Sequence, residues 1–284
     1  PRAGADLLNA KAQPDQGARN ALTFLSYAEK FLAGSWRFDT YFGRDTLMSV
    51  RLLMPALQPA AVETGLFSVL ARLSPQGEVA HEEDIGEFAI LDHRKADGSS
   101  SDAPVYNYNM VDSDYMLAPV ARAWLLDDPR GRTRAAAFLA RRVDGETLGA
   151  RMVRNLRFVL RQAQPFARDP VAARLIALKP GMDAGEWRDS NDGLAGGRIP
   201  YDVNAVLVPA ALDSAAALEA SGLLRPYLAA SDAKAFGEAR AVADIWRTKA
   251  PPLFDVTLAP AEARQAVSRY ARMIGVPDAP ALAA

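Results

Sequence analysis

The chain contains no cysteine and only two histidines, His81 and His93, among its 284 residues. The absence of cysteine excludes disulfide scaffolds, cysteine-based zinc sites and thiol nucleophiles. Two imidazoles are too few for a metal site built on several histidines, so no metal is expected.

The chain also lacks long apolar runs and an excess of charge of one sign. No run approaches the ~20 apolar residues that span a bilayer, so no membrane partner is expected. The net charge is −1, with lysine and arginine scattered among the acids, which gives no electrostatic footprint for nucleic acid. No initiator methionine or signal peptide is visible, so we expect a processed or excised chain, in either the cytoplasm or the periplasm.

Helix-forming patterns dominate the sequence. Half of the residues are hydrophobic, which suffices for a sizeable core, and we expect one domain over residues 1–284. Alanine, leucine and arginine fill the periodic segments, whereas strand signals are few, so the sequence predicts an all-α protein. The predicted helices are residues 17–34, 46–57, 59–73, 113–126, 133–142, 147–163, 203–220, 232–247 and 261–273.

Two long loops, about residues 74–111 and 179–201, separate these helices. Loops of this length in a compact domain are usually functional or disordered, and their acids and aromatics favour function. Residues 112–119 and 202–209 resemble each other, each with an aspartate at a helix start and a proline further on. This similarity suggests repeated helical hairpins, with chance as the alternative.

The arginine row at 151, 154 and 157 is interpreted as a solvated outer face rather than a phosphate site.

The first candidate constellation lies at residues 36–46. Arg44 and Asp45 follow Gly43 at the start of a helix, with Trp36 upstream. A guanidinium and a carboxylate can hydrogen-bond sugar hydroxyls, and an aromatic face can stack on a sugar ring. The alternative is a helix-capping aspartate beside an arginine, with core aromatics.

Two further constellations fall in the long loops. His81 and Glu82 belong to an acid-rich segment, residues 75–87, which is either a solvated charge run or a loop held against a surface. Glu186 and Asp189 flank Trp187 in a glycine-rich loop, where an aromatic neighbour could raise the pKa of a general acid. The alternative there is an ordinary turn rich in aspartate and glycine.

Taken in order, these segments resemble the six-hairpin glycosidases, and most closely the glycogen debranching, trehalase and glucoamylase group. The matching motifs are Gly43-Arg44-Asp45-Thr46, Glu78-Val79-Ala80-His81-Glu82, the Asp112 segment, Trp187-Arg188-Asp189-Ser190 and Tyr201-Asp202-Val203-Asn204-Ala205. The resemblance covers about residues 36–220. It implies an (α/α)6 toroid with its active site at one end, hydrolysis of a glucosidic bond with inversion, a carbohydrate partner and no cofactor.

The resemblance also implies roles for individual residues, according to their positions in the matching motifs. The resemblance implies that Arg44 and Asp45 bind the non-reducing glucose and that Glu82 lines the same pocket. It makes Asp189 the general acid, with Glu186 as the competing candidate. The full set of expected substrate-binding residues is Trp36, Arg44, Asp45, His81, Glu82, Asp112, Trp187 and Asp202.

The chain departs from the family pattern in two ways. The family's general base is usually a late loop glutamate, whereas Glu219, Glu238 and Glu262 all fall in predicted helices. A toroid also needs twelve helices, and fewer are predicted. We therefore expect a toroid that is incomplete at the C-terminus, with its base outside this chain.

Two alternatives remain open at this stage. A polysaccharide lyase or uronic-sugar hydrolase on the same toroid would depend more on Tyr106, Tyr108, His81 and His93. A non-enzymatic helical-repeat scaffold would bind protein partners, although no short repeat period is visible.

Overall fold

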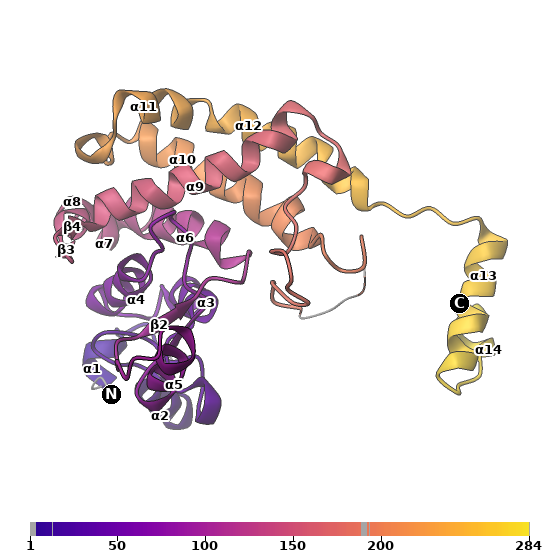
Figure 1. The fold of residues 1–284 in the computed structure, drawn as a ribbon, viewed down its shortest axis with the longest axis horizontal. Helices are drawn as coiled ribbons and strands as arrows, with labels where there is room; N and C mark the ends of the chain where they lie inside the picture. The colour runs from indigo at the N-terminus through magenta and orange to yellow at the C-terminus, as the bar shows by residue number, and fades with distance from the viewer. Residues whose placement is uncertain (1–3, 13, 189–191, 193, 284) are drawn as a thin grey trace.

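The chain is mostly helical. The computed structural model describes residues 4–12, 14–188, 192 and 194–283. Helices account for 59% of the chain, and its described strands form only two small antiparallel sheets, β1–β2 and β3–β4. The prediction of an all-α protein is therefore confirmed (Figure 1).

The elements follow one another along the chain with short connections in most places. The α-helices are α1 (Gly4–Leu7), α2 (Gln16–Phe24), α3 (Gly43–Leu53), α4 (Pro59–Ala71), α5 (Glu87–Ala96), α6 (Ser113–Arg122), α7 (Pro129–Arg132), α8 (Ala135–Ala140), α9 (Leu148–Arg168), α10 (Val208–Ala220), α11 (Ala230–Gly237), α12 (Ala239–Lys249), α13 (Pro260–Met273) and α14 (Ala279–Leu282). Short helical turns are η1 (Trp36–Phe38), η2 (Ala123–Asp127), η3 (Ala172–Arg174), η4 (Val203–Leu207), η5 (Arg225–Tyr227) and η6 (Pro251–Phe254). The strands are β1 (Glu82–Asp84), β2 (Val105–Asn107), β3 (Arg142–Val143) and β4 (Glu146–Thr147).

The main helices are arranged in two rows. In one row α3 packs on α6 and α6 packs on α10, and in the other row α4 packs on α9 and α9 packs on α12. Contacts between α3 and α4, α6 and α9, and α10 and α12 join the rows pairwise. Each helix of the first row therefore packs on a helix of the second row, and α10 also contacts α9.

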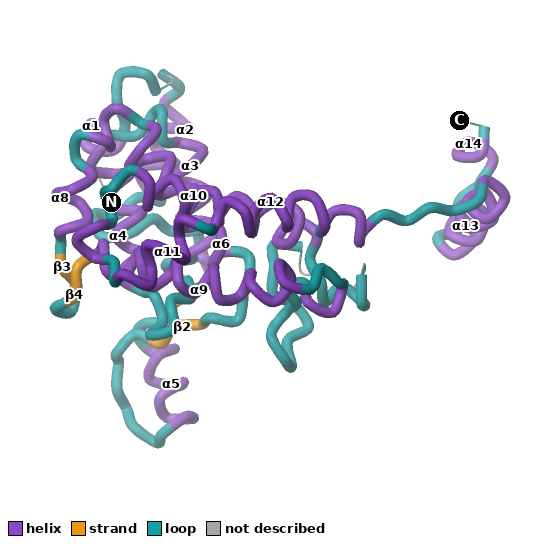
Figure 2. Tube along the Cα trace, turned by 90° about the horizontal axis from the view of Figure 1, so that it is seen from above, coloured by secondary structure: helices purple, strands orange, loops and turns teal. Residues whose placement is uncertain are grey.

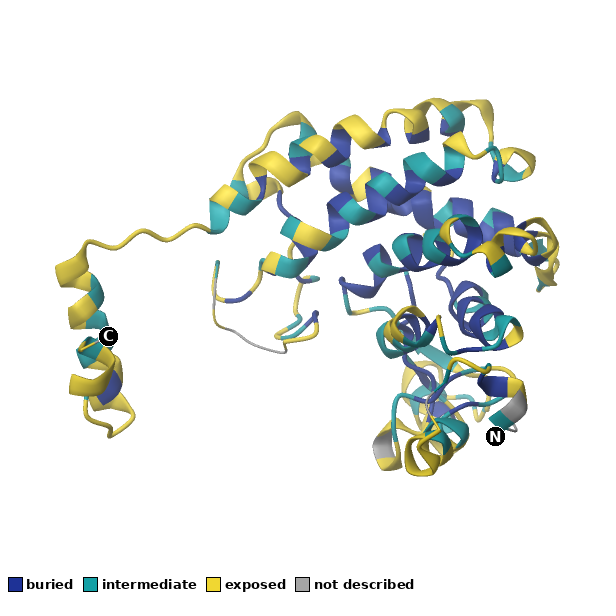
Figure 3. Cartoon of the chain, turned by 180° about the vertical axis from the view of Figure 1, so that it is seen from behind, coloured by how far each residue is buried: buried dark blue, intermediate teal, exposed yellow. Residues whose placement is uncertain are grey.

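Burial of apolar stripes holds the rows together. Figure 3 shows buried residues along the helices of both rows. Along α9 the side chains of Leu148, Met152, Leu156 and Val159 are all buried. These positions recur at helical spacing and face one side, as the sequence predicts, and each fully buried side chain of this size contributes about 1.5–3 kcal/mol.

One helical stretch is apolar almost throughout. Residues Val203–Ala220 form the one described helix that is long and apolar enough to cross a membrane. Half of that stretch is buried, and α10 packs against α6, α9 and α12. A helix that is apolar on most sides is expected at the centre of a bundle, because every face meets another helix.

The two similar sequence segments begin neighbouring helices. Asp112 precedes α6, and Asp202 precedes the continuous stretch η4–α10. Both helices contain a π-helical turn, η2 at the end of α6 and η4 at the start of α10. If the two segments belong to repeated helical pairs, the helices that they begin should lie side by side, as α6 and α10 do.

Several predicted segments differ from the structure, and the helix predicted at residues 232–247 is interrupted at Glu238, between α11 and α12. The helix predicted at residues 17–34 ends at Phe24, because the chain reverses and Leu32 donates its N–H to Leu25 O at 2.8 Å. This turn buries Phe31 and Leu32 in the core. The loop predicted at residues 74–111 contains β1, α5 and β2, whose long-range pairing carries no local sequence signal.

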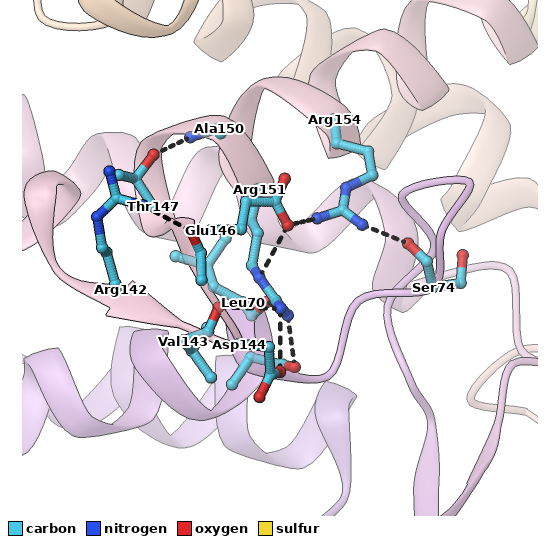
Figure 4. Close-up of polar contacts among 12 residues, drawn as sticks. Leu70, Ser74, Arg142, Val143, Asp144, Glu146, Thr147, Ala150, Arg151 and Arg154 are labelled. Carbon is cyan, nitrogen blue, oxygen red and sulfur yellow. Dashed lines mark hydrogen bonds and ion pairs between the residues drawn. The ribbon is translucent and has the colours of Figure 1, made fainter.

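The arginine row on α9 is only in part the solvated face that the sequence suggested, because Arg157 is exposed whereas Arg151 is buried. Arg151 is buried and donates to Ala71 O at 2.7 Å and to Asp144 Oδ2 at 3.1 Å. Both Arg151 and Arg154 form ion pairs with Glu146 (Figure 4). Arg151 and Arg154 are paired because the β3–β4 hairpin folds back over the start of α9, which sequence spacing does not reveal. Arg157 pairs instead with Asp232 of α11.

The C-terminal helices stand apart from the two rows. After η6 the chain runs as an extended segment to α13, and α13 packs against α14. Figures 1 and 2 both show this pair well separated from the remaining helices.

Candidate functional site

The start of α3 is fixed by close contact with the segment before β1. The N–H of Gly43 donates to His81 O at 2.8 Å, and Phe42 forms a bridge with Glu82. A Cβ on residue 43 would lie 2.2 Å from Ala80 O. Only glycine allows the two backbones to approach this closely, so Gly43 fixes the position of the first turn of α3 and of Arg44 within it.

An ion pair joins the starts of α3 and α6. Arg44 Nη1 lies 3.0 Å from Asp112 Oδ2, and the Asp112 side chain is only 1% exposed. The other carboxylate oxygen of Asp112 accepts the N–H of Ser113 at 2.7 Å. A carboxylate is favourable here because the N-terminus of a helix presents free N–H groups and a partial positive charge.

The glycine-rich loop lies against the same end of α6. Gly185 O accepts the N–H of Val111 at 2.7 Å, directly before the α6 N-cap. The next residue, Glu186, is buried and accepts the N–H of Arg188 at 3.0 Å. Burial raises the pKa of Glu186, and the nearby carboxylates of Asp202 and Asp112 raise it further.

Asp202, at the start of η4, adds a third helix start to those of α3 and α6. Its pKa is raised, mainly by burial and also by Asp112, while a hydrogen bond from the Trp187 side chain opposes the shift. The starts of α6 and η4 therefore place two carboxylates within electrostatic reach of Glu186, and Arg44, at the start of α3, is paired with one of them, Asp112. A carboxyl group with a raised pKa among other acids is typical of a general acid, although structural clusters can also produce it.

A first hollow of about 680 Å³ opens beside these acids. Its lining residues are Glu186, Trp187, Arg188, Asp192, Leu194, Ala195, Gly197, Ile199, Pro200, Tyr201, Asp202, Leu253, Phe254 and Val256. Trp187 and Tyr201 are exposed, and the Tyr201 ring packs edge-on against Phe254 with centroids 5.1 Å apart. The volume falls within the range of small-molecule pockets, and the mixture of aromatic faces and carboxylates suits a polyhydroxylated ligand.

A second hollow of about 1010 Å³ lies along β1 and the start of α5. It is lined by Trp36, Asp39, Thr40, Glu82, Glu83, Asp84, Ile85, Glu87 and Phe88. Burial raises the pKa of Glu82, and the carboxylate of Asp84 raises it further. His81 is buried behind this hollow, with its ring 5.3 Å from that of Phe42.

The structure thus divides the expected site residues. Residues brought together around the first hollow and its neighbouring helix starts are Arg44, Asp112, Glu186, Trp187 and Asp202. Asp45 lies half-buried in the first turn of α3. Trp36 and Glu82 line the second hollow instead, so the single pocket expected from sequence is replaced by two. Asp189 lies outside the described residues.

Two residues that support the site were missed in the sequence. Asp114 is buried and accepts the N–H of Val79 at 2.7 Å, and burial raises its pKa well above the ordinary value. Asn155, on α9, donates to Gly77 O at 2.9 Å and to Asp114 O at 3.1 Å. Together they hold the backbone that leads to His81 and Glu82. A second acid in the first turn of α6 was the available signal for Asp114.

The residues required by a lyase do not line the first hollow. The Tyr108 hydroxyl donates to Arg72 O at 3.0 Å, and burial raises its pKa to about 12. Tyr106 packs against Tyr108, and burial raises its pKa as well. His93 lies on α5, 3.0 Å from Ala103 O. A tyrosine base would need a lowered pKa, so these surroundings do not favour that chemistry.

The raised pKa of Glu186 predicts a pH-dependent stability. Between the ordinary carboxyl pKa and the raised value, the folded chain holds a proton that the unfolded chain releases, so stability falls as the pH rises through this window. Glu186→Gln removes this effect and is expected to raise the midpoint of thermal unfolding at pH 7. The difference from the wild type should shrink toward pH 4. Glu219→Gln, on α10 and outside the hollow, is the control; an equal gain at both pH values in Glu186→Gln would contradict the assignment.

The fold and site define a mostly helical protein whose acids gather at the starts of neighbouring helices. Among the described residues, no group of three or more histidine, cysteine, aspartate or glutamate side chains could hold a metal ion. Comparisons with protein-family models, with curated proteins and with solved structures found no match to this chain.

Proposed function

We propose that the chain is an inverting glycoside hydrolase that acts on glucosidic bonds of an oligosaccharide or polysaccharide. The observation that carries the proposal is the meeting of three helix starts from one row, those of α3, α6 and η4–α10. They bring Asp112 and Asp202 near the buried carboxyl of Glu186, with Arg44 paired to Asp112 and the side chain of the exposed Trp187 hydrogen-bonded to Asp202.

The finer part of the proposal is that the two rows belong to an (α/α)6 toroid. In such a toroid the inner helices pack side by side, each inner helix has an outer partner, and the site lies at one end of the inner row. The pairs α3–α4, α6–α9 and α10–α12 follow this order along the chain. Their packing supports the toroid, and closure of the ring is the part that the proposal adds.

The proposal assigns the general acid to the loop that follows Gly185. The resemblance selects Asp189, and Glu186 is the competing candidate because its raised pKa favours the protonated form that a general acid needs. The exposed ring of Trp187 would stack on a sugar, and Arg44, paired with Asp112 at the neighbouring helix starts, would hydrogen-bond hydroxyls of the same ligand.

The general base is placed outside this chain. The late glutamates are on helices: Glu219 on α10, Glu238 at the start of α12 and Glu262 on α13, and none of them lines the first hollow. In an inverting reaction the acid protonates the leaving oxygen while a carboxylate roughly 6.5–9.5 Å away activates water on the opposite face.

The assay follows from this division of roles. Azide is already a nucleophile and attacks the anomeric carbon without help from a base. The chain with azide and an α-glucoside should therefore form the inverted glucosyl azide. In this reaction the glycosidic carbon–oxygen bond breaks, and the acid protonates the departing oxygen. Asp189→Asn is expected to slow this reaction by about 10²–10⁴-fold. Asp183→Asn, an exposed residue of the same loop, is the matched control.

The outcomes distinguish between the two candidate acids and also test the proposed mechanism as a whole. If Glu186→Gln rather than Asp189→Asn stops the reaction, Glu186 is the acid. No glucosyl azide from the wild-type chain, or a product of retained configuration, would contradict the proposed mechanism.

A further inference from the structure

The C-terminal arm, residues 255–283, carries an apolar surface with no covering element among the described residues. In α13 the side chains of Val267, Tyr270, Met273 and Ile274 recur at helical spacing, and Tyr270 and Met273 are 60% and 75% exposed. The opposite side of α13 is held by α14, through hydrogen bonds from Ser268 to Asp278 at 2.5 Å and from Arg264 to Leu282 O at 3.0 Å.

The same helix is basic. Arg264, Arg269 and Arg272 are all exposed on α13, whereas its one acid, Glu262, caps the first turn. None of the described residues forms an ion pair with Arg269 or Arg272. An apolar stripe beside a row of arginines is typical of a helix that docks on an acidic apolar surface, or that lies on an anionic membrane.

The second hollow has the complementary composition. Trp36, Ile85 and Phe88 are exposed around it, with Trp36 90% exposed. Asp39, Glu82, Asp84 and Glu87 add carboxylates, and no lysine or arginine occurs among its described lining residues. Glu83 also lines the hollow, but its carboxylate is already neutralised by ion pairs with Arg72 at 2.6 Å and with Lys30.

We propose that α13 of one copy docks in the second hollow of another copy, so that the chain self-associates through its C-terminal arm. The apolar stripe of α13 would cover the exposed aromatics, while the arginines at its edge would meet the unpaired carboxylates of the rim. The complementarity of charge and of apolar surface identifies the occupant, and the crowded acids give the site a strong preference for cations.

The arrangement in space requires a second copy. The second hollow lies on β1 and α5, and both Figure 1 and Figure 2 place α5 at the opposite end of the molecule from α13. The arm is joined to the remaining helices by the short exposed segment after Phe254, which allows it to reach a neighbour. If two copies exchange arms reciprocally the contact closes into a dimer, and otherwise it extends into a chain.

Sedimentation velocity over about 1–100 μM protein tests the proposal. The wild-type chain is expected to associate with increasing concentration and to dissociate in 0.5 M salt, because rim charges are screened. Asp84→Lys with Glu87→Lys in the hollow, or Arg269→Glu with Arg272→Glu on α13, should each weaken association at least about tenfold, since like charges face each other across the contact. An equimolar mixture of the two double variants should associate again, because each offers one reversed surface that matches the other.

Arg240→Glu with Lys249→Glu on α12 is the matched control, since both residues are exposed on a helix outside the contact. This variant should associate as the wild type does. A wild-type chain that stays monomeric throughout, or charge-reversed variants that associate unchanged, would overturn the proposal. So would a monomeric wild type that binds vesicles of anionic lipid through α13. None of these residues belongs to the proposed acid or sugar site, so the result is independent of the glycosidase assay.

Discussion

Replacing Arg44 with methionine is expected to lower the free energy of unfolding by about 3–5 kcal/mol, because it leaves a buried carboxylate without its partner. The Asp112 side chain is 1% exposed and pairs with Arg44 at 3.0 Å. Methionine keeps much of the apolar stem of arginine, so the loss reports the charge rather than the volume. Urea denaturation at pH 7 measures the change.

The double variant Arg44→Met, Asp112→Asn tests the cause. Asparagine carries no charge and can still accept the N–H of Ser113, so the double variant should recover at least half of the lost stability. A double variant less stable than Arg44→Met would show that the ion pair is not the source of the effect.

Gly43→Ala is expected to destabilise the chain by about 2–3 kcal/mol through a backbone collision. The added Cβ would lie 2.2 Å from Ala80 O and 2.8 Å from Val79 Cγ1. The start of α3 would have to move away from the segment that carries His81 and Glu82. Chemical denaturation measures the loss of stability.

Gly237→Ala is the matched control, because it lies at the end of α11 with no atom within 4 Å of the added Cβ. It should be neutral or stabilising by up to about 1 kcal/mol, as alanine is favoured over glycine in helices. Equal effects from the two substitutions would contradict the steric account of Gly43.

Much of the helical pattern was predictable from the sequence because it is local. The apolar stripe of α9 and the boundaries of the Val203–Ala220 stretch follow from spacing that each helix carries within itself. The sequence also identified Arg44, Asp112 and Asp202 as candidates, since each stands at a helix start.

The rest depends on contacts between distant segments. The partners of Arg151 lie on α4 and in the β3–β4 hairpin, so its burial could not be read from the spacing of the arginines. Trp36 and Trp187 line different hollows. Trp36 belongs to η1, near β1, whereas Trp187 belongs to the glycine-rich loop, which lies against the start of α6. Asp114 was missed because only the three-dimensional packing brings Val79 to it.

Calorimetric titration with a linear glucose oligosaccharide tests the central claim, that the helix starts beside the first hollow form a neutral-sugar site. The wild-type chain should show saturable binding, and Trp187→Ala should weaken it at least about tenfold through loss of ring stacking. Trp36→Ala, in the second hollow, should bind like the wild type. Tighter binding of a uronic oligosaccharide, or binding that Trp187→Ala leaves unchanged, would contradict the account.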